Sequence, residues 1–577
     1  MRDNKKIIWL IALSVVIVMA AKYIKSLSNP GFKTGDIPMH MAVEWNGIIS
    51  QELNKSEIFL NVDDKAIPVS DKDLFMSEGN ELFLNTDRLK DIFFCVVNVV
   101  DNEFFYIEKG NTQVIMNKNT SGVTVNNSYK KTDEVILSQY GRNYIPFSVL
   151  QNYFSYDYKW DYEKTTAYCI NLKQDEKIYP FAYDYRKLGR ILRVNDQAEL
   201  GTCWAFASLT AIETTFMPEY VFDFSEDHMS INNDFNLEQS EGGKYNMSMA
   251  YLASWKGPVY EKEDPYGDGY SPEGLTSAFH VQEIQIIPSK DLEGIKKAIF
   301  LYGGVQSSLY MPLGYTYKES SEYYDAEHSS FYHIGNEKAN HDVVIIGWDD
   351  SYSADNFTTR PEGDGAFICV NSWGEEFGEE GFFYVSYYDS GIGVHNMVYT
   401  RIDDNDNYDN IYQSDLCGWV GQLGYNREYG YFANAYTAGK DEMLEAIGFY
   451  ATTPGTSYEV YVVENFENEK SFSNKIKLAE GSFSNAGYYT VDLDKSVFLP
   501  KDSKYAVVVF INSPSSLRPI AIECVTSGFT SGVEIEDGEG YISLHGSSWE
   551  NVEKTQNCNI CLKAFTSDYT EQEGNKG

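Results

Sequence analysis

Cysteine, histidine and basic residues are all scarce in this sequence of 577 residues. Eight cysteines are too few, in a chain of this length, for a scaffold that is held together by disulfides. The 46 lysines and arginines are outnumbered by 85 aspartates and glutamates, which gives a formal net charge of -39. Because a surface of that charge repels phosphate backbones, we do not expect nucleic-acid binding.

The sequence also lacks a convincing set of metal ligands. Cys558 and Cys561 have the gap of a zinc or redox motif, but no second pair accompanies them, and they lie in a strand-like stretch. The acidic run 403–407 lacks the turn glycine and the final glutamate of a calcium loop. We therefore expect no metal and no cofactor, and we interpret the acidic run as a solvated linker.

One long apolar run stands near the N-terminus. Residues 7–21 are apolar apart from Ser14, and they follow basic residues and end before Lys22. This length is short for a membrane-spanning helix and typical of a signal-peptide core. Residues 1–25 are predicted to be a signal peptide or, because tilted helices tolerate short spans, an uncleaved anchor. The protein is then secreted or held at the outer face of a bacterial cell membrane, which it contacts only through this segment.

The features of an activated cysteine lie around Cys203. The stretch that follows it, to Phe216, has no glycine or proline and is rich in alanine, which predicts a helix beginning at the cysteine. Free N–H groups and the positive dipole end at a helix N-terminus favour the thiolate, which is the nucleophilic form. Thr202 is expected to cap this helix, and Gly201 to allow a sharp turn and close approach of a substrate.

A histidine and an asparagine downstream provide the groups that such a thiol needs. His341 precedes the apolar run 343–348, a buried strand in pattern, which would hold the imidazole at a cleft. Asn371 follows a second strand pattern, and its amide oxygen can accept a hydrogen bond from His341. An indole at Trp373 could shield that bond from water.

In order and context, these residues resemble the papain family of cysteine peptidases. The resemblance implies that Cys203 is the nucleophile, His341 the base and Asn371 the residue that orients the base. It also implies that Gln197 is the oxyanion-hole glutamine, which would meet the developing charge together with the backbone N–H of Cys203. The reaction expected from this set is hydrolysis of a peptide bond through a thioester, without a cofactor.

The resemblance covers residues 180–402 and implies a fold of two lobes, one helical and one a β-barrel. Gly242 and Gly243 correspond to the glycines that bind the substrate backbone, and Trp373 is expected to line the same cleft. Leu200 stands where many relatives have a disulfide cysteine, so that bridge is expected to be missing. Because the four candidate catalytic residues lie between residues 197 and 371, a fragment of about residues 177–404 is expected to fold and act alone.

Both flanks of this region have patterns of their own. Residues 45–172 read as strands with one short helix, residues 147–153, and a closing strand pair, residues 158–160 and 167–170. They resemble the N-terminal domain named after copper amine oxidases, which implies no copper site. Residues 408–566 contain short alternating runs between glycine, serine and asparagine clusters, which predicts a β-sandwich. Its segment 540–549 resembles the lectin-like domain that follows papain-type enzymes in bacteria, and this implies a glycan partner. The polar tail 567–577 is predicted to be disordered.

The predicted fold class is therefore α+β, with a papain-like catalytic domain between a small α+β domain and a β-sandwich. The predicted function is that of an exported cysteine endopeptidase acting on peptide or protein substrates. Two alternatives remain open. One is a cell-surface adhesin or carbohydrate-binding protein with an idle papain fold, and the other is a transpeptidase or amidase acting on cell-wall peptides.

Overall fold

A computed structural model describes residues 58–569, apart from short gaps of which the longest are 162–165, 173–178 and 313–317. The predicted signal peptide or anchor, residues 1–25, lies outside the described residues, and so do residues 570–577. Within the described part of the chain, no helix is both long and apolar enough to cross a membrane.

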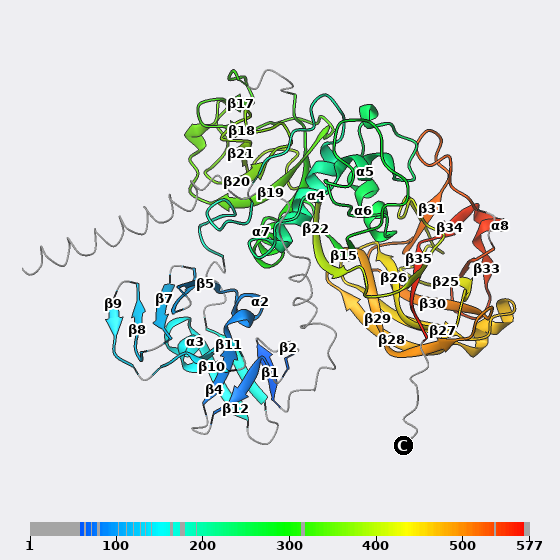
Figure 1. Cartoon of the computed structure of the whole chain (residues 1–577), viewed down its shortest axis with the longest axis horizontal. Coiled ribbons are helices and arrows are strands. Elements are labelled where there is room, and N and C mark those ends of the chain that lie inside the picture. Colours follow the sequence, from blue (N-terminus) through cyan, green and yellow to red (C-terminus); the bar gives the residue numbers. More distant parts are fainter. Residues whose placement is uncertain are drawn as a thin grey trace, which may run out of the picture. The chain divides into compact units, whose positions relative to one another are not determined.

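The first part of the described chain is built from small sheets and two short helices (Figure 1). The predicted helix is present as α3 (Phe147–Tyr153), and the predicted closing pair is present as antiparallel β12 and β13. Phe93, Phe105 and Phe147 are fully buried in its core. The remaining elements are β1 (Phe59–Val62), β2 (Lys65–Ile67), β3 (Leu74–Met76), β4 (Leu82–Asn85), α2 (Leu89–Phe93), β5 (Val96–Val100), β6 (Phe104–Lys109), β7 (Thr112–Asn117), β8 (Val123–Val125), β9 (Ser128–Lys130), β10 (Leu137–Gln139), β11 (Arg142–Pro146), β12 (Tyr156–Asp161) and β13 (Thr166–Asn171).

The middle of the chain forms the two expected lobes. The helical lobe contains α4 (Cys203–Phe216), α5 (Glu226–Ile231) and α6 (Tyr245–Ala253), while α7 (Leu292–Leu301) packs on the sheet of the other lobe. Almost every side chain of α4 after Cys203 is buried, because this helix contacts α5 and α6 on one side and β19 on the other. Its alanine-rich sequence suits this close packing on all sides.

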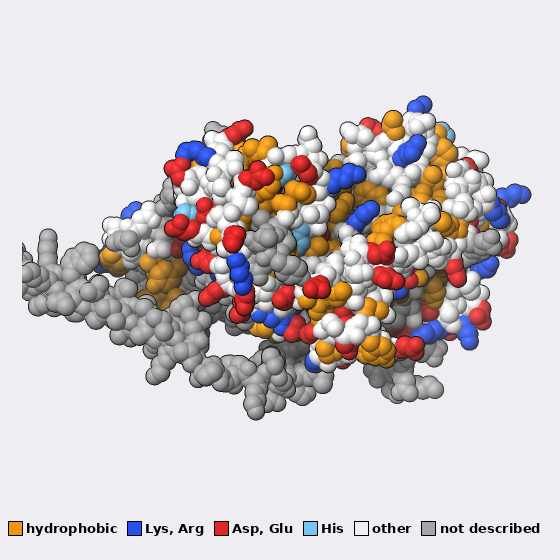
Figure 2. Space-filling view, turned by 90° about the horizontal axis from the view of Figure 1, so that it is seen from above, with side chains coloured by type: hydrophobic (Ala, Val, Ile, Leu, Met, Phe, Trp, Pro, Cys, Tyr) orange, Lys and Arg blue, Asp and Glu red, His pale blue; other side chains and the backbone are white. Residues whose placement is uncertain are grey.

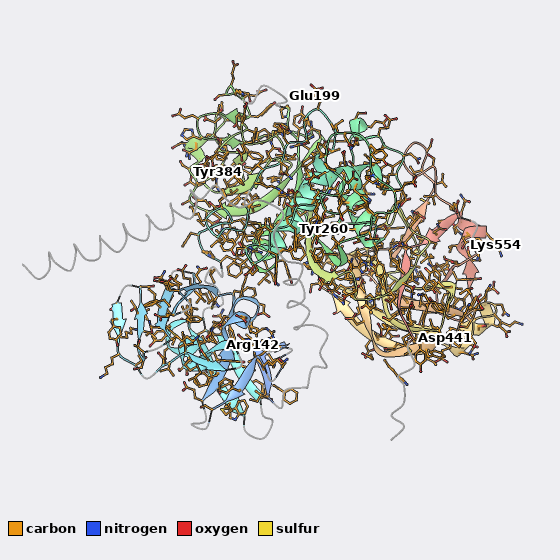
Figure 3. The ribbon with its side chains drawn as sticks, in the orientation of Figure 1. Arg142, Glu199, Tyr260, Tyr384, Asp441 and Lys554 are labelled. Atoms are coloured by element: carbon orange, nitrogen blue, oxygen red, sulfur yellow. The ribbon has the colours of Figure 1, made fainter. Side chains whose placement is uncertain are left out.

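The second lobe is a sheet in the order β17-β18-β21-β20-β19-β16-β22-β15. Its central strand β19 starts at His341, as the apolar pattern predicted, and is buried along nearly all its length. The strands are β14 (Ala182–Asp184), which pairs with β19, β15 (Phe279–Ile287), β16 (Val305–Leu309), β17 (Tyr324–Asp325), β18 (Ser330–Phe331), β19 (His341–Asp349), β20 (Ala366–Val370), β21 (Phe382–Ser386) and β22 (Asn396–Asp404). Tyr384 of β21, labelled in Figure 3, accepts a hydrogen bond from Arg186 just after β14 (3.0 Å).

The predicted β-sandwich is present after residue 408. One of its sheets has the order β28-β27-β30-β25-β32-β33, and a small sheet has the order β24-β31-β34. The elements are β23 (Asn410–Tyr412), β24 (Gly421–Leu423), β25 (Tyr429–Thr437), β26 (Glu442–Ala451), β27 (Thr456–Val463), β28 (Ile476–Phe483), β29 (Ala486–Leu499), β30 (Lys504–Asn512), β31 (Ile520–Cys524), β32 (Gly540–Ser543), β33 (Glu550–Asn551), α8 (Val552–Gln556), β34 (Cys558–Ile560) and β35 (Leu562–Asp568). Strand β35 thus extends into the segment expected to be a tail.

The sandwich and the second lobe share one sheet. Strand β15 pairs with β22 on one side and with β29 of the sandwich on the other, and β26, β35 and β23 continue the sheet (Figure 1). Tyr450 and Tyr488 of the sandwich belong to the same buried apolar cluster as α4 and β19. The two regions therefore have a common core as well as a common sheet.

Candidate active site

Cys203 occupies the first position of α4 and lines a cleft of about 1020 Å³. His341, Gln197 and Trp373 line the same cleft, so the structure brings these sequence-predicted residues together. The face shown in Figure 2 carries acidic and basic side chains scattered among neutral ones. A cleft of this volume is in the range that holds a peptide segment or a drug-sized ligand.

His341 and Asn371 form the predicted hydrogen bond. The Nε2 of His341 donates to the Oδ1 of Asn371 over 2.7 Å, and both side chains are buried. This bond fixes the tautomer and leaves Nδ1 of the imidazole for exchange of a proton with a thiol. The indole of Trp373 lies against the imidazole, with ring centres 4.9 Å apart, as expected for a shield from water.

Hydrogen bonds hold both the backbone and the side chain of Gln197. Its backbone N–H donates to the carbonyl of Ser372 (2.8 Å), and its Oε1 accepts from the hydroxyl of Ser372 (2.6 Å). Its Nε2 donates to the carbonyl of Leu200 (2.7 Å), which uses one of the two amide hydrogens. The second hydrogen is available to an oxyanion in the cleft. Glu199, on the loop between these residues, is exposed (Figure 3).

Thr202 does not cap α4, so that prediction is wrong. No side-chain capping bond is formed, because the hydroxyl of Thr202 pairs with the hydroxyl of Tyr266 (2.6 Å). Tyr266 also donates to the carbonyl of Gln197 (2.9 Å) and so ties the loop before the nucleophile to α4. Sequence reasoning missed Tyr266, since only the folded chain brings it to this loop.

Burial opposes the ionisation of both reacting groups. Burial, with the negative charge of Asp342, raises the pKa of the Cys203 thiol to about 12, while the backbone N–H groups of Asp342, Trp204 and Cys203 act in the opposite direction. Burial lowers the pKa of His341 to about 4, and the hydrogen bond that His341 donates to Asn371 acts in the opposite direction. The thiolate expected from the helix N-terminus alone is therefore opposed by a desolvation penalty from burial.

Gly242 and Gly243 lie at the wall of the cleft, where the packing is too close for larger residues. A Cβ at Gly243 would collide with the indole nitrogen of Trp204, and a Cβ at Gly201 would lie 2.6 Å from the backbone nitrogen of Gly242. Gly242 has φ of 84°, a conformation that other residues rarely adopt. Both glycines line the cleft, which leaves their backbone open to a peptide.

The sandwich reaches the residues next to this glycine pair. Asn236 donates its backbone N–H to the carbonyl of Phe529 (2.8 Å), and Lys244 places its ammonium group 4.7 Å from the ring centre of Phe529. Lys244 also lines the cleft. One wall of the cleft is thus supported by a loop of the sandwich.

All eight cysteines lie among the described residues, and each is a free thiol. Leu200 has no thiol, and none of the described cysteines is bonded to another. Cys558 lies in β34 opposite Cys524, and the described residues contain no group of three side chains able to hold a metal ion.

Comparison with known proteins divides the chain in the same way. Residues 179–402 match the model of the papain family cysteine proteases, residues 411–566 that of a lectin-like domain, and residues 99–169 that of a copper amine oxidase N-terminal domain. A viral cathepsin of Epiphyas postvittana nucleopolyhedrovirus is 25% identical over 231 residues, which are 39% of this chain and 65% of the cathepsin. A cathepsin L-like peptidase of Aedes aegypti is 26% identical over 35% of this chain and 58% of its own length.

Solved structures of a clostridial cysteine protease, Cwp84, resemble a larger part of the chain. One, after propeptide cleavage, is 28% identical, with a TM-score of 0.61, and covers 67% of this chain and 99% of the solved one. Another contains the cysteine protease and lectin-like domains of the same Clostridium difficile protein, described as surface-layer associated, at 26% identity and a TM-score of 0.59. The similarity supports the arrangement of a two-lobed α+β domain with a β-sandwich behind it.

Proposed function

Residues 179–402 form a domain of the papain family of cysteine proteases, and from this premise we propose that the protein is a cysteine endopeptidase. The observation that carries the proposal is the hydrogen bond from His341 Nε2 to Asn371 Oδ1, formed in the cleft that Cys203 lines. A protein that had abandoned catalysis would have no need to keep this geometry.

In the proposed reaction, the thiol of Cys203 gives its proton to Nδ1 of His341 as sulfur attacks the carbonyl carbon of the peptide bond. The oxyanion that forms accepts hydrogen bonds from the backbone N–H of Cys203 and the free amide hydrogen of Gln197. The imidazolium then protonates the leaving amine, and a thioester remains. Water, deprotonated by His341, hydrolyses that thioester and restores the thiol.

The surroundings of the reaction are proposed from the relatives and from the N-terminal run. Cwp84 is surface-layer associated, and the apolar run 7–21 is typical of export signals. We place the protein outside the cell, secreted or anchored through residues 1–25. The lectin-like sandwich would then bind a glycan and hold the peptidase near its substrate.

A digest of a peptide library by the purified chain tests the proposed activity. We expect new free carboxyl ends, detected by mass spectrometry, and a single adduct of a papain-type epoxide inhibitor at Cys203. Cys203→Ala should abolish cleavage, whereas Cys524→Ala, at a partly buried thiol in the sandwich, should leave it unchanged.

The division of labour among the other groups gives a graded expectation. His341→Ala should be nearly as severe as loss of the thiol. Gln197→Ala should lose on the order of 100- to 1000-fold in kcat, and Asn371→Ala about 10- to 100-fold, because it loosens only the orientation of the imidazole. A folded Asn371→Ala variant as inactive as Cys203→Ala would contradict the orienting role.

The same digest separates the alternatives. An idle adhesin would cleave nothing and would leave the epoxide unreacted. A transpeptidase or amidase would show the Cys203 adduct, but it would join the acyl group to an added amine or act only on cell-wall peptides.

A further inference from the structure

A buried carboxylate, that of Asp342, lies directly beside His341. Asp342 follows His341 at the start of β19, and it lines the cleft with Cys203, Tyr245 and Ser308. It is 8% exposed, so it forms part of the floor of the cleft rather than its rim. None of the proposed catalytic steps uses its carboxylate.

Asp342 has neutral hydrogen-bond donors as its partners. Gln306 Nε2 donates to its Oδ2 over 2.9 Å, and the hydroxyl of Ser308 also bonds to it. Gln306 is itself held in place, because its Oε1 accepts a hydrogen bond from Tyr399 (3.1 Å). Burial raises the pKa of Asp342, which these two bonds oppose.

Two other buried acids of this protein have a cation beside them. Asp350 pairs with Lys296 (2.5 Å) and Asp415 with Lys563 (2.8 Å). Among the described residues, no lysine or arginine forms an ion pair with Asp342. His395 interacts electrostatically with Asp342, stacks on Tyr245 with ring centres 5.4 Å apart and also lines the cleft. A buried carboxylate with neutral partners is costly, and a cation that reaches it is strongly favoured.

A peptide substrate can bring that cation. Lysine and arginine have apolar stems that pack on aromatic and aliphatic groups while the charged end reaches a partner. Tyr245 and Met311 line the cleft near Asp342 and provide such surfaces. A guanidinium or ammonium group at the floor would complete the ion pair that the protein leaves open.

We propose that Asp342 determines specificity, by selecting a lysine or arginine side chain in the substrate residue that occupies this subsite. The proposal rests on the proposed peptidase function and adds the class of substrate. Rim charges of both signs, from Glu241, Glu337, Lys244 and Lys338, lie on the same cleft and nearly cancel one another. We therefore assign the selection of a basic substrate side chain to Asp342 at the floor of the cleft and not to the charges at its rim.

Fluorogenic peptides assayed with the full chain test this assignment. Each of the three residues before the cleaved bond is varied in turn as arginine or as citrulline, its neutral isostere, and kcat/KM is measured. At one position we expect arginine to be preferred, and Asp342→Asn to reduce the arginine-to-citrulline ratio by about 10- to 100-fold. Glu337→Gln, at the rim, is the matched control and should keep the ratio.

The outcomes separate the two proposals. Cleavage without an arginine preference at any position would overturn the role of Asp342 and leave the peptidase proposal standing. An equal loss on arginine and citrulline peptides in Asp342→Asn would also overturn it, because the residue would then act only by positioning His341. If no peptide is cleaved and Cys203 takes no epoxide, both proposals fail.

Discussion

Removing one buried lysine should destabilise the whole assembly of peptidase and sandwich. Lys563 on β35 donates to Asp415 Oδ1 (2.8 Å) and to Gln413 Oε1 (2.8 Å), and the side chains of Lys563 and Asp415 are 1% and 0% exposed. Gln413 in turn donates to the carbonyl of Ser254 in the helical lobe (3.1 Å). The lysine thus fixes the segment that joins the two regions.

The expected loss of unfolding free energy follows from the carboxylates that Lys563→Met would leave without a cation. Asp415 would be buried without a cation, and Glu523, whose pKa burial already raises to about 7, would lose a nearby positive charge. Breaking one side of a buried pair costs about 3–5 kcal/mol, whereas replacing both sides by neutral groups is often close to neutral. We therefore expect Lys563→Met to lose about 3–5 kcal/mol, and Asp415→Asn/Lys563→Met to recover most of it.

Urea unfolding measures both variants, with tryptophan fluorescence and far-ultraviolet circular dichroism as separate probes. Two probes are needed because a chain with several domains need not unfold in one step. The loss in Lys563→Met should grow as the pH rises, because the uncompensated carboxylates have raised pKa values and their stabilising protons are then removed. A single variant within about 1 kcal/mol of the parent, or a double variant no more stable than the single one, would refute this reasoning.

Two further predictions concern a glycine and a buried acid. Gly243→Ala should cost about 1–3 kcal/mol and lower kcat/KM, because its methyl group would collide with the buried indole of Trp204 and shift the cleft wall at Gly243; unchanged kinetics in a folded variant would contradict this. Burial raises the pKa of Glu213 to about 8, so its contribution to stability is complete below its usual 4.5 and is lost as the pH rises through about 8. The melting temperature should accordingly rise from pH 8.5 to pH 6, and Glu213→Gln should flatten that slope, while an unchanged slope would count against the assignment.

Local patterns predicted the elements that carry the site. The helix beginning at Cys203, the strand beginning at His341 and the helix over residues 147–153 are encoded by neighbouring residues, and each is present at the expected place. The sandwich strand at 505–510 is likewise present within β30. Such patterns need only the alternation of apolar and polar residues within one element.

Contacts between distant segments could not be predicted in this way. The pairing of Tyr266 with Thr202 replaces the expected helix cap, and no local feature of either residue signals it. The place of Asp342 on the floor of the cleft depends on β16, which supplies Gln306 and Ser308. The raised pKa of the Cys203 thiol depends on burial, which is a property of the folded chain.

The sheet that runs from β22 through β15 into β29 makes the peptidase region and the sandwich one folding unit. A fragment ending near residue 404 would bare the hydrogen-bonding edge of β15 at residues 283–286 and the apolar surface that Tyr450 and Tyr488 cover. An unpaired edge strand of that kind pairs with strands of other molecules, so such a fragment should aggregate rather than act alone. This differs from the expectation that was based on the positions of the candidate catalytic residues. The sandwich is consequently not a detachable tether. If the sandwich binds a glycan as proposed, the shared sheet fixes the distance between that glycan and the cleft.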